Sequence, residues 1–171
     1  LLARPVDDFV ADFVGADRAL KSLSLTRVEQ IDLIPPPLVH VGESAHEVRA
    51  RIDRGQIVPI ADHVLVATDD DRPLDWLPVG RLDDLDQIPP SAPGGAEPVI
   101  DQVTTLRDAL SALFEANAAY GPVVDERGRC IGLVGAAEIS AGFRQAAGVS
   151  SAEVPPPAPA TLDARTGSAG G

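Results

Sequence analysis

Cysteine is almost absent from the chain, since Cys130 is the only one among 171 residues. A single thiol excludes an internal disulfide and any metal site built from several cysteines, which favours a cytoplasmic setting. Methionine is absent altogether, including at position 1. A chain that opens instead on Leu-Leu is expected to be a piece of a longer protein whose remainder lies upstream.

Positive charge is also scarce. Lys and Arg number 14 against 26 Asp and Glu, which gives a net charge of −12. This balance argues against nucleic acid or an anionic membrane surface as the main partner. No apolar run approaches the roughly 20 residues that a bilayer-spanning helix needs, so we expect no membrane insertion. No Gly-x-x-x-x-Gly-Lys-Ser/Thr loop occurs either, so we expect no enzyme activity from these residues and assign no catalytic residue.

What the chain does contain is a repeated order of elements. The predicted helix caps Ser44 and Thr105 lie 61 residues apart, and the strand residues Val66 and Val124 lie 58 apart. Each copy is predicted to run strand, helix, strand, hairpin turn, strand, helix. Neither copy has enough strands to close a core alone. The sequence therefore predicts an α/β fold in which two similar repeats pack as a pseudo-twofold pair.

An apolar face marks the N-terminal end. Pro5 suits a first helical position and Gly15 a C-terminal cap, which predicts a short helix over residues 5–14. Phe9 and Phe13 lie four residues apart on one face of this helix. Such a face packs either on the chain's own core or on a domain upstream of it.

A second helix is predicted from Thr26, with Glu29 as its capping-box partner and the proline run at 35–37 as its end. The remaining elements are expected as strands at 38–41, 64–67, 74–79, 99–103, 123–124 and 130–134, and as helices at 45–52, 106–117 and 137–145, with the beginning of a helix at 80–85.

The segment Ala119–Ile139 resembles the C-terminal half of a CBS (cystathionine β-synthase-type) domain. Its Pro122-Val-Val-Asp and Gly132-Leu-Val stretches match the two strands of the family pattern. Residues 6–18, followed by Val-Glu-Gln-Ile at 28–31, are similar to the junction that follows the nucleotide-binding domain in ATP-binding subunits of glycine betaine, carnitine and choline ABC importers. Those subunits end in a tandem CBS pair, so the resemblance covers residues 6 to about 143.

The resemblance implies a regulatory module of an osmoprotectant importer that mediates dimerisation and signal-dependent control of transport. The implied partners are a second copy, an upstream ATPase domain and the transporter's membrane subunits, at the inner face of the cell membrane. The expected organisation follows from the resemblance and from the Pro- and Gly-rich stretches: a junction helix at 1–25, a first, degenerate CBS-like repeat at 26–88, a linker at 89–98, a second repeat at 99–148 and a disordered tail at 149–171.

The resemblance also implies a ligand site in the second repeat, formed by Tyr120, Pro122, Leu133, Gly135 and Glu138. In relatives that bind cyclic di-AMP an aromatic residue at the place of Tyr120 stacks on the base, and such stacking contributes about 1–3 kcal/mol. The hydroxyl residue and the aspartate that hold adenosine in nucleotide-binding relatives are replaced here by Gly135 and Glu138. Two alternatives to the regulatory role therefore stay open: a module that senses an adenine nucleotide or cyclic di-AMP, and a purely structural dimerisation domain.

The first repeat departs further from the family pattern and carries much of the negative charge. Residues 62–86 hold eight carboxylates against Arg72 and Arg81, so we expect this repeat to bind no anionic ligand. Any response to salt is expected to act by screening of this acidic cluster against an arginine-bearing partner.

Three other candidate features predict no site. His40 and His46 lie on different predicted elements without the spacing of metal ligands, and we expect them and His63 to be surface residues. The acidic run at 69–71 is predicted to be a solvated turn, and Cys130 is predicted to be a core residue.

Overall fold

The computed structural model describes residues 17–146. The helix expected over 5–14 and the tail expected over 149–171 lie outside the described residues. Residues 17–25 are helical. The elements that follow are η1 (Val28–Gln30), β1 (Leu38–His40), α2 (Ala45–Asp53), β2 (His63–Ala67), β3 (Pro73–Pro78), η2 (Val79–Asp84), β4 (Ile100–Asp101), α3 (Leu106–Glu115), β5 (Tyr120–Val124), β6 (Cys130–Gly135) and α4 (Ala136–Ala146).

The elements form two sheets of identical topology. In the first repeat β1 pairs parallel with β2, which pairs antiparallel with β3; β4, β5 and β6 of the second repeat do the same. Both hairpins shift register at the same place, after Val66 and after Val123. The residue that corresponds to Val66 is therefore Val123, and the predicted match with Val124 is wrong by one residue. The expected pseudo-twofold architecture is confirmed.

The two helix caps correspond as predicted. Ser44 accepts a hydrogen bond from the Glu47 amide at 3.4 Å, and Thr105 accepts one from the Asp108 amide at 3.2 Å. A side-chain oxygen at this position satisfies one of the amides that the first helical turn leaves unpaired. These caps fix where α2 and α3 begin, and with them the ends of β1 and β4.

The helix predicted from Thr26 is wrong, because only the 3-10 turn Val28–Gln30 forms there. The carbonyl of Thr26 accepts from the Leu106 amide, and the amide of Val28 donates to Thr104, both at 2.9 Å. Backbone groups paired in this way are not free to form an α-helix. Val28 and Ile31 are buried in the core of the second repeat, so this segment connects the start of the chain to the later repeat.

The helix expected at 80–85 is the 3-10 helix Val79–Asp84, in the place where the second repeat has the eleven-residue α4. The backbone of the next residues pairs with another segment: the carbonyl of Asp86 accepts a hydrogen bond from the amide of Ala45, and the amide of Ile88 donates to the carbonyl of Glu43. This pairing with the start of α2 leaves no chain to extend the helix.

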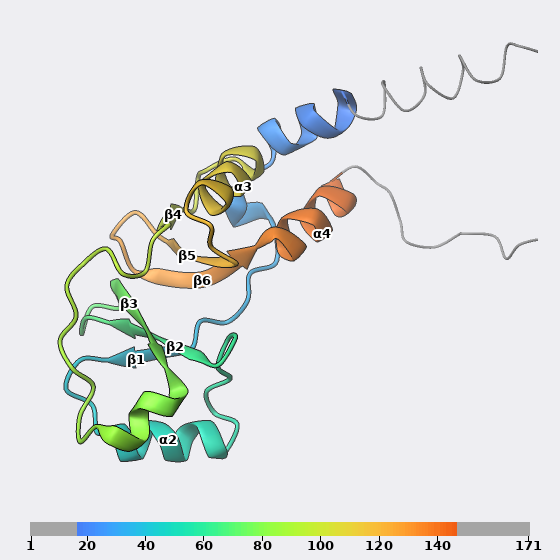
Figure 1. Cartoon of the computed structure of the whole chain (residues 1–171). Coiled ribbons are helices and arrows are strands. Elements are labelled where there is room, and N and C mark those ends of the chain that lie inside the picture. Colours follow the sequence, from blue (N-terminus) through green and yellow to red (C-terminus); the bar gives the residue numbers. More distant parts are fainter. Residues whose placement is uncertain (1–16, 147–171) are drawn as a thin grey trace, which may run out of the picture.

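Each repeat has its own core, and a third core lies between them. The two sheets face each other at the middle of the molecule, with α2 and η2 outside the first sheet and α3 and α4 outside the second (Figure 1). The shared core consists of Leu65, Ala96, Cys130 and Leu133, with Ile34, Leu38, Ile60 and Trp76 packed against it. Both sheets thus bury one face on a helix layer and the other on the opposite repeat. Within residues 17–146, no helix has both the length and the hydropathy for a membrane crossing.

Candidate functional site

The structure brings the five expected site residues together on one hairpin and the helix that follows it. Tyr120 on β5 pairs with Gly135 on β6, and Pro122 pairs with Leu133. Glu138 lies in the first turn of α4. Three of the five are buried, with Leu133 fully inaccessible in the core between the repeats.

The polar group of this set is already engaged. The Glu138 carboxylate accepts a hydrogen bond from the Gly135 amide at 3.0 Å. A carboxylate at the start of a helix also interacts favourably with the helix dipole, so this contact stabilises the beginning of α4. Glu138 therefore has a local structural partner in the place where a ribose-binding aspartate is expected.

Gly135 has no space for a side chain. A Cβ built at this position would lie 2.9 Å from Cδ1 of Tyr120, 2.9 Å from the carbonyl oxygen of Ala119 and 3.0 Å from a carboxylate oxygen of Glu138. The tyrosine ring occupies the space that a threonine or serine would need. The hairpin thus lacks the hydroxyl of the nucleotide-binding pattern. Its neighbours pack so closely on Gly135 that a side chain there would displace them.

Tyr120 also lines a cavity of about 240 Å³ between the two repeats. His63 on β2 holds the position that corresponds to Tyr120, because the two residues begin their pairings with Pro78 and Gly135. The walls are mainly apolar, and Glu97 supplies the one carboxylate among the lining residues. The cavity is lined by Ile60, Ala61, His63, Trp76, Glu97, Ala118, Ala119 and Tyr120.

Sequence reasoning missed Trp76 and Glu97 as cavity residues. Trp76 is the only tryptophan of the chain. It lies in a strand that departs from the family pattern, and this combination is a signal that could have marked it as a candidate binding residue. That it lines the same cavity as Tyr120 depends on how the two sheets pack, which the sequence does not specify. A flat apolar group is the kind of ligand that such walls favour.

The histidines and the cysteine do not form a metal site. Among residues 17–146, no group of three His, Cys, Asp or Glu side chains is arranged to hold a metal ion. His46 is exposed on α2, whereas His40 lies in a polar network with Glu43 and Asp71. Cys130 is buried in the core between the repeats, and this burial raises the pKa of its thiol to about 11.

Comparison with known proteins agrees with this geometry. The family model of the CBS domain matches residues 96–142, which cover the linker end and most of the second repeat. The fold is similar to the cystathionine β-synthase pair domain of a Mg²⁺ transporter from Shewanella oneidensis, with a TM-score of 0.52 at 18% identity over 71% of this chain and 72% of that one. Residues 96–142 are a CBS domain, and the two repeats together have the fold of a tandem CBS pair.

The relatives of this CBS region are importer subunits. It is 32% identical over 141 residues to the osmoprotectant import ATP-binding protein OsmV of Salmonella typhimurium, covering 78% of this chain and 34% of that protein. It is 28% identical over 142 residues to the choline transport ATP-binding protein OpuBA of Bacillus subtilis, covering 78% and 35%. The CBS region spans about a third of the length of these relatives, and its sequence relation to importer ATP-binding proteins bears out the resemblance.

Proposed function

We propose that this CBS region is the regulatory module of the ATP-binding subunit of an osmoprotectant importer, and that it controls transport by pairing with a second copy. The observation that carries the proposal is the identity of 32% over 141 residues to an osmoprotectant import ATP-binding protein. That relation extends well beyond the residues matched by the CBS family model. A change in how two copies meet would bias the closure of the attached ATPase domains.

Exposed apolar side chains support the pairing. Phe114 on α3 is 74% exposed, and Leu25, just before the segment that pairs with α3, is 79% exposed. Covering such side chains with a second copy removes apolar area from water, which favours association. We therefore assign the contact between copies to the α3 side of the second repeat.

The pairing is tested by sedimentation of the 171-residue chain over a range of concentrations. Phe114→Asp places a charge in the proposed contact and is expected to shift the protein to monomer while its circular dichroism stays unchanged. Val58→Asp, at a residue 68% exposed on the first repeat, is the matched control and is expected to leave association unchanged. Equal behaviour of the two variants would contradict the assignment.

The regulatory role is tested with the assembled importer in liposomes. An ATP-binding subunit shortened by residues 26–146 is expected to keep basal ATPase and transport activity and to lose its response to an osmotic or ionic step. A response that survives the deletion would overturn the proposal. A basal activity that disappears with the module would identify it as structural instead.

The cavity favours one second candidate function, the sensing of an adenine-containing ligand. The cavity of about 240 Å³ is somewhat smaller than the roughly 300–1,000 Å³ of pockets for drug-sized ligands, so it has room for a base-sized group. Trp76 and Tyr120 supply aromatic faces for stacking. Polar selectivity would rest on His63 and Glu97 among the lining residues, since Glu138 does not line the cavity and is hydrogen-bonded to the Gly135 amide.

Calorimetry with ATP, AMP and cyclic di-AMP separates this candidate from a purely structural dimerisation domain. Sensing predicts saturable micromolar binding that Tyr120→Ala abolishes and Tyr120→Phe retains, since phenylalanine keeps the stacking face. No heat at millimolar ligand would leave dimerisation without a ligand.

A further inference from the structure

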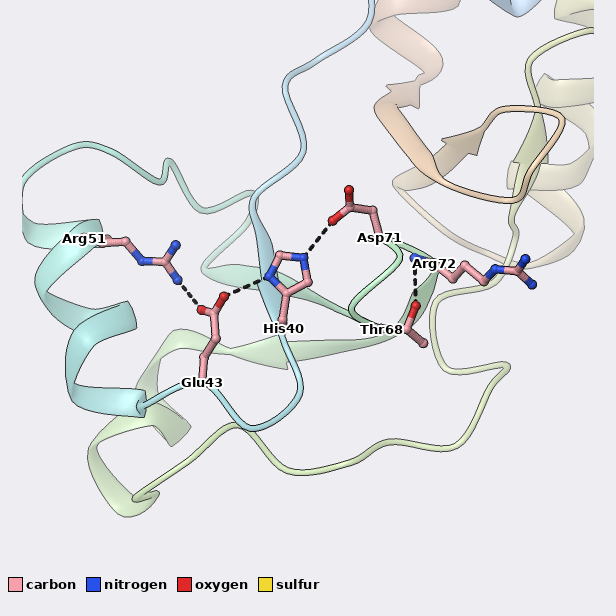
Figure 2. A network of polar contacts seen from close by, with 6 residues as sticks. All are labelled: His40, Glu43, Arg51, Thr68, Asp71 and Arg72. Atoms are coloured by element: carbon pink, nitrogen blue, oxygen red, sulfur yellow. Dashed lines mark hydrogen bonds and ion pairs between the residues drawn. The ribbon is translucent and has the colours of Figure 1, made fainter.

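His40 lies between two carboxylates at the end of β1 (Figure 2). Its Nδ1 is 2.8 Å from Oε1 of Glu43, and its Nε2 is 2.7 Å from Oδ1 of Asp71. Neutral imidazole carries one N–H, so one ring nitrogen would then face a carboxylate oxygen lone pair to lone pair. Only the imidazolium ion donates to both carboxylates. The arrangement of His40, Glu43 and Asp71, called the His40 cluster below, therefore depends on the charge of the ring.

Asp71 has an unusual backbone conformation. It lies in the turn between β2 and β3 with φ of 61°, in the left-handed region that favours glycine. The corresponding turn of the second repeat has Gly128 there, with φ of 79°. The first repeat thus places a side chain where its counterpart has none, and that side chain is the one that His40 binds. The contact with His40 favours a turn that the backbone alone disfavours.

The same residue joins the two repeats. The carbonyl oxygen of Asp71 accepts a hydrogen bond from the amide of Cys130, the first residue of β6, at 2.8 Å. The symmetric bond would need an amide at Pro73, which corresponds to Cys130 in the first repeat. Proline has no N–H, so this connection exists in one direction only. The position of the Asp71 turn therefore affects the contact between repeats directly.

We propose that the His40 cluster is a pH-dependent switch between the repeats. The imidazolium form of His40 holds Asp71 in its left-handed turn and thereby maintains the hydrogen bond to β6. The neutral form releases one carboxylate, and because Glu43 is adjacent in the β1–α2 loop, Asp71 is the partner that moves away. The turn then relaxes and the connection to Cys130 weakens.

Charged groups from every neighbouring element act on His40. Glu43 also pairs with Arg51 of α2 (Figure 2), which tempers its attraction for the ring. Asp69 and Asp70 are exposed and bring further negative charge to the turn that holds Asp71. On the β6 side lies the Cys130 thiol, whose pKa is raised mainly by burial, with a smaller contribution from the charge of Asp71, so that it stays neutral. The surrounding field is negative on balance and favours the imidazolium form.

The pH range follows from the direction of the shift. The hydrogen bond to Asp71, with a further contribution from Glu43, outweighs desolvation and raises the pKa of His40 above 6.5. A raised pKa in the folded state means that the stabilisation is complete below pH 6.5 and is lost as the pH rises through the folded pKa. The switch therefore opens on alkalinisation above pH 6.5.

The test measures amide hydrogen exchange of Cys130 by NMR in the 171-residue chain from pH 6 to 8.5, expressed as a protection factor. We expect protection to fall by roughly threefold to tenfold as His40 loses its proton, given the strength of hydrogen bonds to charged groups at a partly exposed site. The amide of Leu133 is the internal reference. It donates a 2.8 Å hydrogen bond to the carbonyl of Ile34, which is not part of the His40 cluster, and its protection is expected to show no such step.

Three variants complete the experiment. His40→Gln is expected to abolish the step, and His46→Gln, at an exposed histidine on α2, is expected to retain it. Asp71→Gly keeps the left-handed turn but removes the carboxylate. It should therefore keep the hydrogen bond of the Cys130 amide and show no step with pH. This variant tests the proposal even where His40→Gln fails to fold. A wild-type profile without a step, or a step that persists in His40→Gln or Asp71→Gly, would overturn the proposal.

Discussion

At the scale of single residues, the second repeat depends on glycines that allow close contact. A Cβ at Gly132 would lie 2.6 Å from Cβ of Leu33, and one at Gly121 would lie 2.7 Å from the carbonyl oxygen of Pro98. Both neighbours belong to segments that enter a repeat from outside its sheet. Because Gly132 and Gly121 carry no side chain, the segment around Leu33 lies directly on β6 and the end of the linker at Pro98 lies directly on β5.

Gly132→Ala tests this packing. The added methyl group has no free space, and overpacking of this kind costs typically about 1–3 kcal/mol of unfolding free energy. Gly80→Ala is the matched control, because nothing lies within 4 Å of a Cβ at that position. Urea denaturation should show a lower midpoint for Gly132→Ala only. Equal midpoints for both variants would show that the linker adjusts without cost.

Cys130 provides a second residue-level prediction. Its pKa rises from 9.0 to about 11 because the thiol is buried, so the reactive thiolate is about a hundredfold rarer at pH 8 than in the unfolded chain. The native protein should react with a disulfide reagent at least that much more slowly than the protein in urea. Rapid labelling of native protein would mean that the core between the repeats opens.

The candidate ligand site shows how far sequence reasoning reaches at this scale. The family pattern predicted that Tyr120, Gly135 and Glu138 lie together, since they follow one hairpin. It did not predict that Glu138 binds the Gly135 amide, because that depends on the first turn of α4. Nor did it predict that Trp76 lines the same cavity as Tyr120, because that depends on the packing of one sheet on the other.

At the scale of elements, local signals predicted what local bonds determine. Ser44 and Thr105 mark the starts of α2 and α3 correctly, because a cap satisfies amides within its own turn. The segment after Thr26 has an equally good cap pattern, yet its backbone pairs with residues 104–106 of the second repeat. Competition from a distant segment is invisible in a local pattern, and this explains why the predicted helix is only a 3-10 turn.

Thr105→Ala measures the contribution of a cap to the whole fold. Loss of the side-chain bond to the Asp108 amide is expected to cost about 1 kcal/mol of unfolding free energy. Ser111→Ala, at an exposed position within α3, is the control and should be neutral or slightly stabilising, since alanine is the better helix former. Thermal unfolding separates the two. A cap variant as stable as the control would show that α3 is held by packing alone.

At the scale of the whole molecule, the repeats depend on each other. The segment at 26–31 comes before β1, yet Val28 and Ile31 are packed in the core of the second repeat, and the sheets share the core around Leu65 and Leu133. The two repeats are therefore expected to unfold as one cooperative unit. Such mutual dependence would let a change at one repeat reach the other, which the proposed switch at the His40 cluster and the proposed contact between copies both require.

The most direct test of this mutual dependence uses the fluorescence of Trp76, which reports on strand β3 of the first repeat where it packs against the shared core, in a variant of the second repeat. Ile139 on α4 is 1% exposed and lies outside the shared core, and truncation of such a residue to alanine typically costs about 2–5 kcal/mol. In Ile139→Ala we predict that the urea transition of Trp76 moves to lower concentration together with the circular dichroism transition. A Trp76 transition that stays in place while circular dichroism becomes biphasic would contradict the account.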